Sequence, residues 1–75
     1  MAKLPVVTAR QALQALRRAG FVVHHQTGAH VHLRHPGQPR LRIVVPNHPG
    51  DLAPRTLRSI LTQANLTVNE FLLLL

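Results

Sequence analysis

A helix near the start of the chain is predicted by apolar residues that recur on one helical face. These residues are Ala9, Ala12, Leu13, Leu16 and Ala19, and the polar residues between them fall mostly outside this stripe. Thr8 and Gln11 have the spacing of a capping box, which marks the first turn of a helix. Gly20 follows the last apolar position and is suited to end the helix.

Three short apolar stretches follow, and their spacing predicts an antiparallel meander. The predicted strands cover residues 21–26, 29–34 and 41–45. Thr27-Gly28 is the predicted turn between the first two strands, and residues 35–39, which are rich in Pro and Gly, form the predicted loop before the third. In the third strand Leu41, Ile43 and Val45 fall on one side and Arg42 on the other, because side chains alternate along a strand.

Two more helices are predicted in the last third of the chain. After a Pro-rich loop over residues 46–54, the second helix begins at about Pro54, a residue that suits a first helical turn. Its buried face is Leu57, Ile60, Leu61 and Ala64, and the pattern breaks at Asn65-Leu66. Thr67 and Glu70 form a second capping box that opens a short helix through Phe71 and the leucines that follow. Five apolar residues in a row cannot all be buried on one helix face, so we expect some of them to contact a partner or a second copy.

The order of these elements predicts an α+β fold: a helix, a three-stranded antiparallel sheet, a helix and a short terminal helix. We expect the helices to cover one face of the sheet. The opposite face would then carry four polar side chains, His30, His32, Arg34 and Arg42.

Charge narrows the choice of partner. The 75 residues are enough for a single domain, residues 1–75, with a thin core and an open surface site. Nine Lys and Arg against two Asp and Glu give a net charge of +7, an imbalance that favours an anionic partner: nucleic acid, an anionic membrane or an acidic protein. The chain holds no Cys, which excludes disulfides, thiolate zinc sites and cysteine nucleophiles. No signal pattern is present, and no apolar run approaches the roughly 20 residues of a membrane span, so a cytoplasmic protein with no membrane contact is expected.

The candidate chemistry lies in the second predicted strand. Val31 and Leu33 would face one side, and His30, His32 and Arg34 the other. Imidazole exchanges protons near neutral pH, and guanidinium binds phosphate. If the anionic partner is a nucleic acid such as RNA, we expect Lys3, Arg34, Arg40 and Arg42 to contact its backbone, with Gly28 and His32 completing the predicted binding set.

The whole pattern resembles the HicA family of bacterial toxins, which are small mRNA interferases. The resemblance covers nearly the full chain and rests on the order and spacing of several segments. These are Arg18-Ala19-Gly20-Phe21, Gly28-Ala29-His30 with Arg34-His35-Pro36, Val45-Pro46, residues 52–61, and residues 66–71.

The resemblance implies a fold similar to the double-stranded-RNA-binding domain and a ribonuclease activity that blocks translation. It also implies a HicB antitoxin as partner, which we expect to cover the catalytic face, with room for a higher-order toxin–antitoxin complex. The family's catalytic His follows a Gly-Ser or Gly-Thr pair, and here His30 follows Gly28-Ala29. His30 is therefore the expected general acid/base, acting on mRNA without metal or cofactor.

Other readings remain open from the sequence. The chain has six histidines, and His24 or His25 could approach His30 and His32, but a structural zinc site usually has four ligands and here no Cys is present. A non-catalytic RNA-binding module would use the same basic face. A small subunit that binds only another protein is the third reading.

Overall fold

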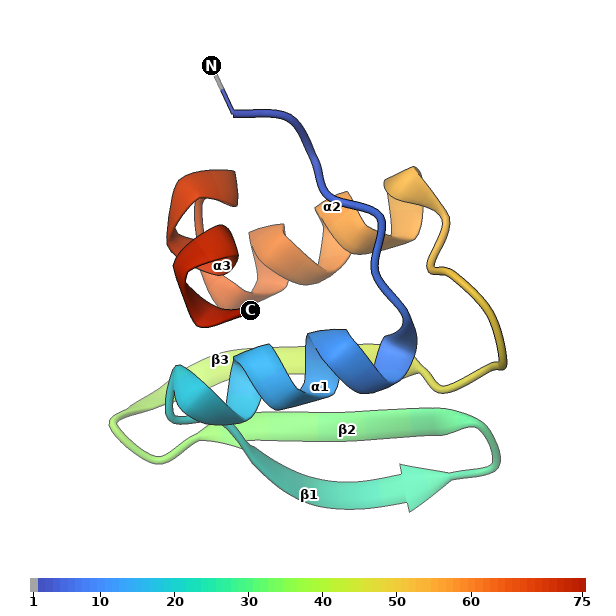
Figure 1. The fold of residues 1–75 in the computed structure, drawn as a ribbon. Helices are drawn as coiled ribbons and strands as arrows, with labels where there is room; N and C mark the ends of the chain where they lie inside the picture. The colour runs from blue at the N-terminus through green and yellow to red at the C-terminus, as the bar shows by residue number, and fades with distance from the viewer. Residues whose placement is uncertain (1) are drawn as a thin grey trace.

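The computed structural model describes residues 2–75 and forms an α+β sandwich, as predicted. The elements follow in the order α1 (Ala9–Arg18), β1 (Val22–Thr27), β2 (His30–His35), β3 (Gln38–Pro46), α2 (Pro54–Ala64) and α3 (Val68–Leu74). The three strands form one antiparallel sheet in the order β1-β2-β3 (Figure 1). This architecture is consistent with the double-stranded-RNA-binding-domain-like fold that the resemblance implied.

The predicted helix boundaries of α1 and α3 are confirmed by their caps. The Thr8 side chain accepts a hydrogen bond from the Gln11 backbone N–H, and the Gln11 side chain accepts one from the Thr8 N–H. Thr67 and Glu70 make the same reciprocal pair at the start of α3. At the end of α1, Gly20 has φ +99°, a left-handed conformation that glycine adopts readily.

The strands differ from their predicted bounds by a residue or more. Thr27 is the last residue of β1 and pairs with His30, so the turn consists of Gly28 and Ala29 rather than Thr27-Gly28. The predicted loop over residues 35–39 is much shorter than expected, because His35 belongs to β2 and β3 already begins at Gln38. The His35 Nδ1 atom accepts from the Gly37 N–H at 3.0 Å and tightens this turn. Pro39 is tolerated because β3 is an edge strand, where a missing backbone donor need not break a ladder.

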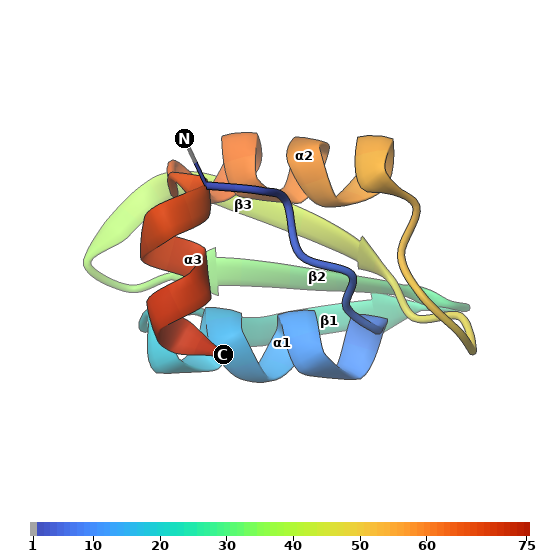
Figure 2. The same cartoon turned by 45° about the horizontal axis from the view of Figure 1, so that its top comes forward.

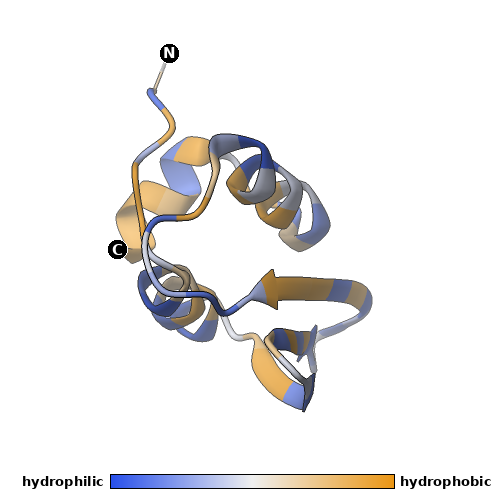
Figure 3. Ribbon diagram, turned by 90° about the vertical axis from the view of Figure 1, so that its right-hand side faces the viewer, coloured by the Kyte–Doolittle hydropathy of each residue, from blue (hydrophilic) through white to orange (hydrophobic). Residues whose placement is uncertain are grey.

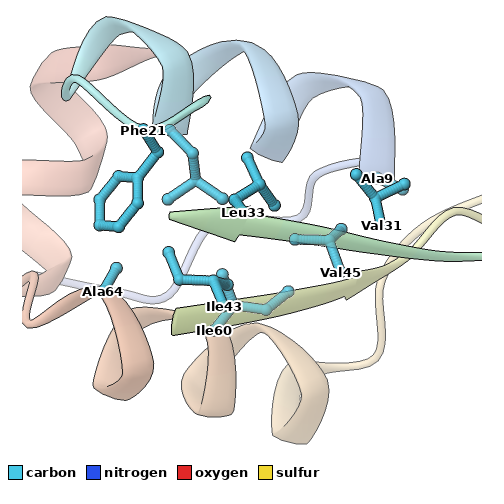
Figure 4. Close-up of a cluster of buried hydrophobic side chains, with 9 residues drawn as sticks. Ala9, Phe21, Val31, Leu33, Ile43, Val45, Ile60 and Ala64 are labelled. Carbon is cyan, nitrogen blue, oxygen red and sulfur yellow. The ribbon is translucent and has the colours of Figure 1, made fainter. Parts of the chain in front are cut away.

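All three helices lie on one side of the sheet (Figure 2). Beneath α1 and α2, the sheet contributes Val31, Leu33, Ile43 and Val45, none of them more than 3% exposed. Phe21, Leu16, Ile60 and two alanines pack against these four (Figure 4). A second cluster joins α1, α2 and α3 around Phe71 and Leu57. Burial of a large aliphatic or aromatic side chain contributes about 1.5–3 kcal/mol, so these clusters dominate the stability of so small a chain.

The hydrophobic C-terminal helix is only partly buried, as predicted. Phe71 is fully buried and Leu74 half-buried, whereas Leu73 is 87% exposed and Leu72 and Leu75 are also exposed. Arg18 fixes the helix end by donating from Nη1 to the Leu74 carbonyl at 2.7 Å. Figure 3 shows the hydrophobic residues of this helix, in orange, beside the C-terminus.

The outer edge of β3 is closed by a side chain from α2. The backbone N–H of Val44 donates to Gln63 Oε1 at 3.0 Å, and Gln63 Nε2 donates in turn to Ser59 Oγ at 2.9 Å. None of the helices formed by residues 2–75 combines the length and apolar character that crossing a membrane requires.

Candidate active site on the open sheet face

His30 is the first residue of β2 and lies directly after the Gly28-Ala29 turn. It pairs with Thr27 on β1 and Pro46 on β3, and its side chain is exposed. The turn before it is held on both sides: Gln26 Nε2 donates to the Gly28 carbonyl at 3.0 Å, and the Asn47 N–H donates to the Ala29 carbonyl at 2.6 Å. The imidazole is therefore carried by a braced backbone and is open to a large substrate.

The strand register confirms that the face opposite the helices carries the predicted polar row. Residues that pair across strands point to the same face, so the open face has three successive rows of side chains. These rows are Thr27–His30–Pro46, His25–His32–Val44 and Val22–Arg34–Arg42. Rows two residues apart on a strand are separated by about 6.6–6.8 Å. His30 therefore lies one row from His32 and two rows from the arginine pair.

A bulge in β1 brings both His24 and His25 to the site, where the sequence indicated that one of them could approach His30 and His32. The pairing shifts between Val23 and His25, so His24 is inserted without a partner in the register. The His25 ring stacks on His32, with ring centroids 4.1 Å apart and planes 12° apart. The His24 ring meets His25 edge-on at 5.1 Å. Strict alternation would have placed His24 and His25 on opposite faces of the sheet. No Gly or Pro in this part of the sequence indicates a bulge.

These rings border a shallow groove of about 170 Å³, which we call the histidine groove. Its polar lining is His24, His25, His32, Arg34 and Arg42, and its other lining residues are Leu33, Ile43 and Val44. His30 lies outside this lining, at the next row of the sheet. The open face thus has two neighbouring parts: the exposed His30 and the histidine groove.

The charges in the groove are uncompensated. Neither acidic residue lines it: Asp51 lies in the loop after β3 and Glu70 caps α3. The positive charge of Arg34 is the main cause that lowers the pKa of His24, and partial burial is the main cause that lowers the pKa of His32. Both imidazoles are therefore mostly neutral at pH 7.

The remaining predicted RNA-binding residues do not all lie near the open face. Arg40 is exposed on β3 near the second hairpin, where the pairing with β2 shifts between Arg34 and His35. Gly28, with φ +58°, is exposed in the turn beside His30. Lys3 is not brought to this face, because its neighbours Ala2 and Leu4 line a hollow with Arg58 of α2 and with the start of α3.

Two other histidines have different surroundings. His35 is part of the packing: its Nδ1 accepts from Gly37, so the proton is on Nε2, which donates to the Ala19 carbonyl at 3.0 Å. The His35 ring also meets Phe21 edge-on at 5.0 Å. His48 lies in the loop after β3, outside the groove. Across the described residues 2–75, no three histidine or acidic side chains are arranged to hold a metal ion.

The geometry, an exposed histidine after a glycine turn on an acid-free cationic sheet face, agrees with a comparison to known families. A family model described as the HicA toxin of bacterial toxin-antitoxin systems matches residues 9–66. The chain belongs to this family. A comparison with curated proteins finds no match. HicA toxins are in general RNA-cleaving toxins, and each belongs to a system in which an antitoxin is the partner.

The HicA match spans the elements that build the open face. Residues 9–66 include α1, all three strands and α2, and exclude both Lys3 and α3. Both parts of the open face, His30 and the histidine groove, lie inside the matched region.

Proposed function

We propose that the chain acts as a single toxin domain that cleaves mRNA, with His30 as general acid/base and without a metal. The observation that carries this proposal is the position of His30: exposed, on a braced turn, and two rows from the cations Arg34 and Arg42, whose groove has no carboxylate in its lining. A general base must reach its proton from the protein surface when the substrate is as large as RNA, and the open face permits this.

RNA supplies its own nucleophile, so one imidazole is sufficient for the proposed reaction. His30 takes the proton of a 2′-hydroxyl, and the 2′-oxygen attacks the adjacent phosphorus. The bond to the 5′-oxygen breaks, and that oxygen takes up a proton, which leaves a 2′,3′-cyclic phosphate and a 5′-hydroxyl. Cations near the phosphorane stabilise its charge, and Arg34 and Arg42 lie on the same face to serve the RNA backbone.

Purified protein incubated with RNA in EDTA tests the proposal. Cleavage should persist in EDTA and yield cyclic-phosphate ends. His30→Ala should reduce the rate by roughly 10²- to 10⁴-fold, which is the usual contribution of a general acid/base. His48→Ala, at another exposed histidine, is the matched control and should cut at the normal rate. An active His30→Ala variant with an unchanged melting temperature would remove His30 from the mechanism.

A non-catalytic RNA-binding module is the second candidate, and one residue favours it. Ala29 stands where the family has Ser or Thr, so no hydroxyl is available there for a bond to phosphate or to the turn. Incubation with RNA separates the candidates, because a module shifts the RNA and leaves it intact. A protein that neither binds nor cuts RNA would fit a subunit that contacts only protein.

We further propose that a HicB-like antitoxin silences the toxin by covering the open face, within a toxin–antitoxin complex. The cations of this face would attract an acidic segment of the partner and speed its association. Hydrogen exchange on the complex is the test: protection should fall on residues 29–34 and 41–45. Protection confined to residues 54–75 would instead place the antitoxin on the helical side.

A further inference from the structure

The histidine groove concentrates positive and protonatable groups with no counter-charge. Its charged and titratable groups come from every strand: His24 and His25 from β1, His32 and Arg34 from β2, and Arg42 from β3. His30 on β2 is the nearest titratable group outside it, and it too lowers the pKa of His32. Carboxylates are absent from the described lining, so an anion would be the natural counter-charge.

Metal binding is the obvious alternative for clustered imidazoles, and the geometry argues against it. Metal ligands must direct their nitrogen atoms at one point, whereas the His25 and His32 rings are stacked nearly parallel. Two guanidinium groups border the same groove and would repel a cation. The same features suit an oxyanion, because guanidinium and protonated imidazole offer only donors.

A nucleobase is the other ligand that imidazole rings can hold, by stacking. Here His25 already stacks on His32 and is met edge-on by His24, so these rings contact one another rather than present a free platform. The guanidinium groups of Arg34 and Arg42 on the neighbouring row favour phosphate.

The distance from His30 fits a backbone phosphate close to the one that reacts. The row of His25 and His32 is one row from His30, about 6.6–6.8 Å along the strand. This corresponds to about two nucleotides, since one strand rises about 3.4 Å per nucleotide in a helix.

We propose that the histidine groove is a phosphate site that holds the RNA backbone about two nucleotides from the phosphate at His30, and that its imidazoles take up protons when the phosphate binds. The inference rests on RNA being the substrate. In the free protein, protonation of His24 is opposed chiefly by Arg34, and protonation of His32 by partial burial and by neighbouring imidazoles. The negative charge of a bound phosphate favours the charged form of both imidazoles and offsets this opposition, so binding and protonation reinforce each other.

The test measures binding apart from cleavage. The probe is a short 2′-O-methyl RNA, which lacks the nucleophile, and the protein carries His30→Ala so that His30 cannot contribute. As the pH falls from about 8 to about 5.5, we expect the affinity to rise about tenfold or more, since one linked proton gives at most tenfold per pH unit. Adding His24→Gln and His32→Gln should abolish most of this rise. Adding His48→Gln instead, as matched control, should preserve it.

A second readout uses inorganic phosphate alone. The ring resonances of His24 and His32 in an NMR titration should show both pKa values rising when phosphate is added, whereas the ring resonances of His48 should not respond to phosphate. Melting curves of each variant separate lost binding from lost structure, and a folded groove variant with the full pH dependence overturns the inference.

The outcomes distinguish this inference from the proposed function. If the unmodified protein cuts RNA but the groove variants bind the probe with unchanged pH dependence, the phosphate site is wrong and the function stands. If the unmodified protein does not cut RNA, but its binding of the probe depends on pH through the groove histidines, the proposed cleavage function is wrong and the phosphate site stands. Absence of probe binding at every pH overturns the site.

Discussion

On the helix-covered face of the sheet, Val31 and Leu33 are 3% and 1% exposed, whereas His32, which lies between them, is half-buried on the open face. The two faces share their strands and backbone hydrogen bonds, and differ only in which alternate residues they display. On one face, shape and apolar contact hold the side chains. On the other, imidazole and guanidinium groups remain beside one another with no helix above them.

This difference explains how so small a chain can carry a chemical site. No polar or charged side chain is buried in the described residues. The clustered charges therefore add no desolvation cost to the core. The open face can keep cations unpaired because water screens them until an anion arrives. Stability and function are thus assigned to opposite faces of the same strands.

The largest effect that tests this separation is expected from neighbouring positions on β2. Leu33→Ala should lower the free energy of unfolding by about 2–5 kcal/mol, because a filled core position becomes a cavity. Arg34→Ala, one residue away on the open face, should change it by about 0.5 kcal/mol or less. Chemical denaturation measures both values.

A milder variant guards against a Leu33→Ala protein that does not fold. Ile43→Val removes one methylene from another fully buried position and should cost about 0.5–1.5 kcal/mol. Equal losses at Leu33 and Arg34 would show that the open face is also part of the packing.

The affinity for RNA should depend on the cations of the open face and not on those of the helical side. With three or four phosphate contacts at about 0.7–0.9 each, log affinity should fall against log salt with a slope of roughly −2 to −4. A fourfold rise in salt then weakens binding by roughly 16- to 250-fold. The His30→Ala protein and uncleavable RNA give this slope directly.

Substitutions that remove one positive charge each show which side chains contact the RNA phosphates. Arg42→Gln should make the slope shallower by about 0.7–0.9, the share of one contact. Lys3→Gln removes the same charge on the helical side and should change the slope less, given where the chain places its neighbours. The reverse order would mean that RNA reaches the helical side of the molecule.

Two glycines with positive φ provide a smaller contrast. A Cβ on Gly20 would lie 2.7 Å from His35 Nε2, which is held by its hydrogen bond to the Ala19 carbonyl. Gly20→Ala therefore adds a steric clash to the strain of the positive φ angle. Gly28 has open space around it, and Gly28→Ala meets only the strain, about 1–2 kcal/mol. Thermal melting should therefore show a larger loss for Gly20→Ala, and equal losses would mean that the His35 ring moves aside freely.

The sequence predicted what depends on periodicity and missed what depends on local departures from it. Apolar alternation and two capping boxes were sufficient for the element order, the buried face of the sheet and the polar row from His30 to Arg34. The bulge at His24 breaks the alternation without a Gly or Pro to mark it, so the histidine groove was not predicted. His35 was assigned to a loop because Pro36-Gly37 follows it, yet its ring completes the packing around Phe21.

The pH dependence of stability gives the smallest expected effect. No titratable side chain is fully buried among the described residues, and the two imidazoles whose pKa is lowered, His24 and His32, lie on the open face. The pKa values of His24 and His32 are lowered from their ordinary value of 6.5, so below pH 6.5 the unfolded chain takes up protons before the folded one. Their stabilising contribution is complete above this pH and is lost as the pH falls toward the lowered values. The pKa of Glu70 is lowered from 4.5 by its hydrogen bonds to Thr67. Glu70 therefore loses its stabilising contribution only when the pH falls below 4.5.

The melting temperature should therefore decline gently between about pH 7 and pH 5, before the carboxylates titrate. Arg34→Gln should flatten this decline, because the Arg34 charge is the main cause of the lowered pKa of His24. Arg55→Gln, which removes an exposed charge from the start of α2, is the matched control and should leave the decline unchanged. A melting temperature that rises on acidification through this range would mean that the imidazoles of the open face are stabilised in their charged form, contrary to the repulsion that the structure indicates.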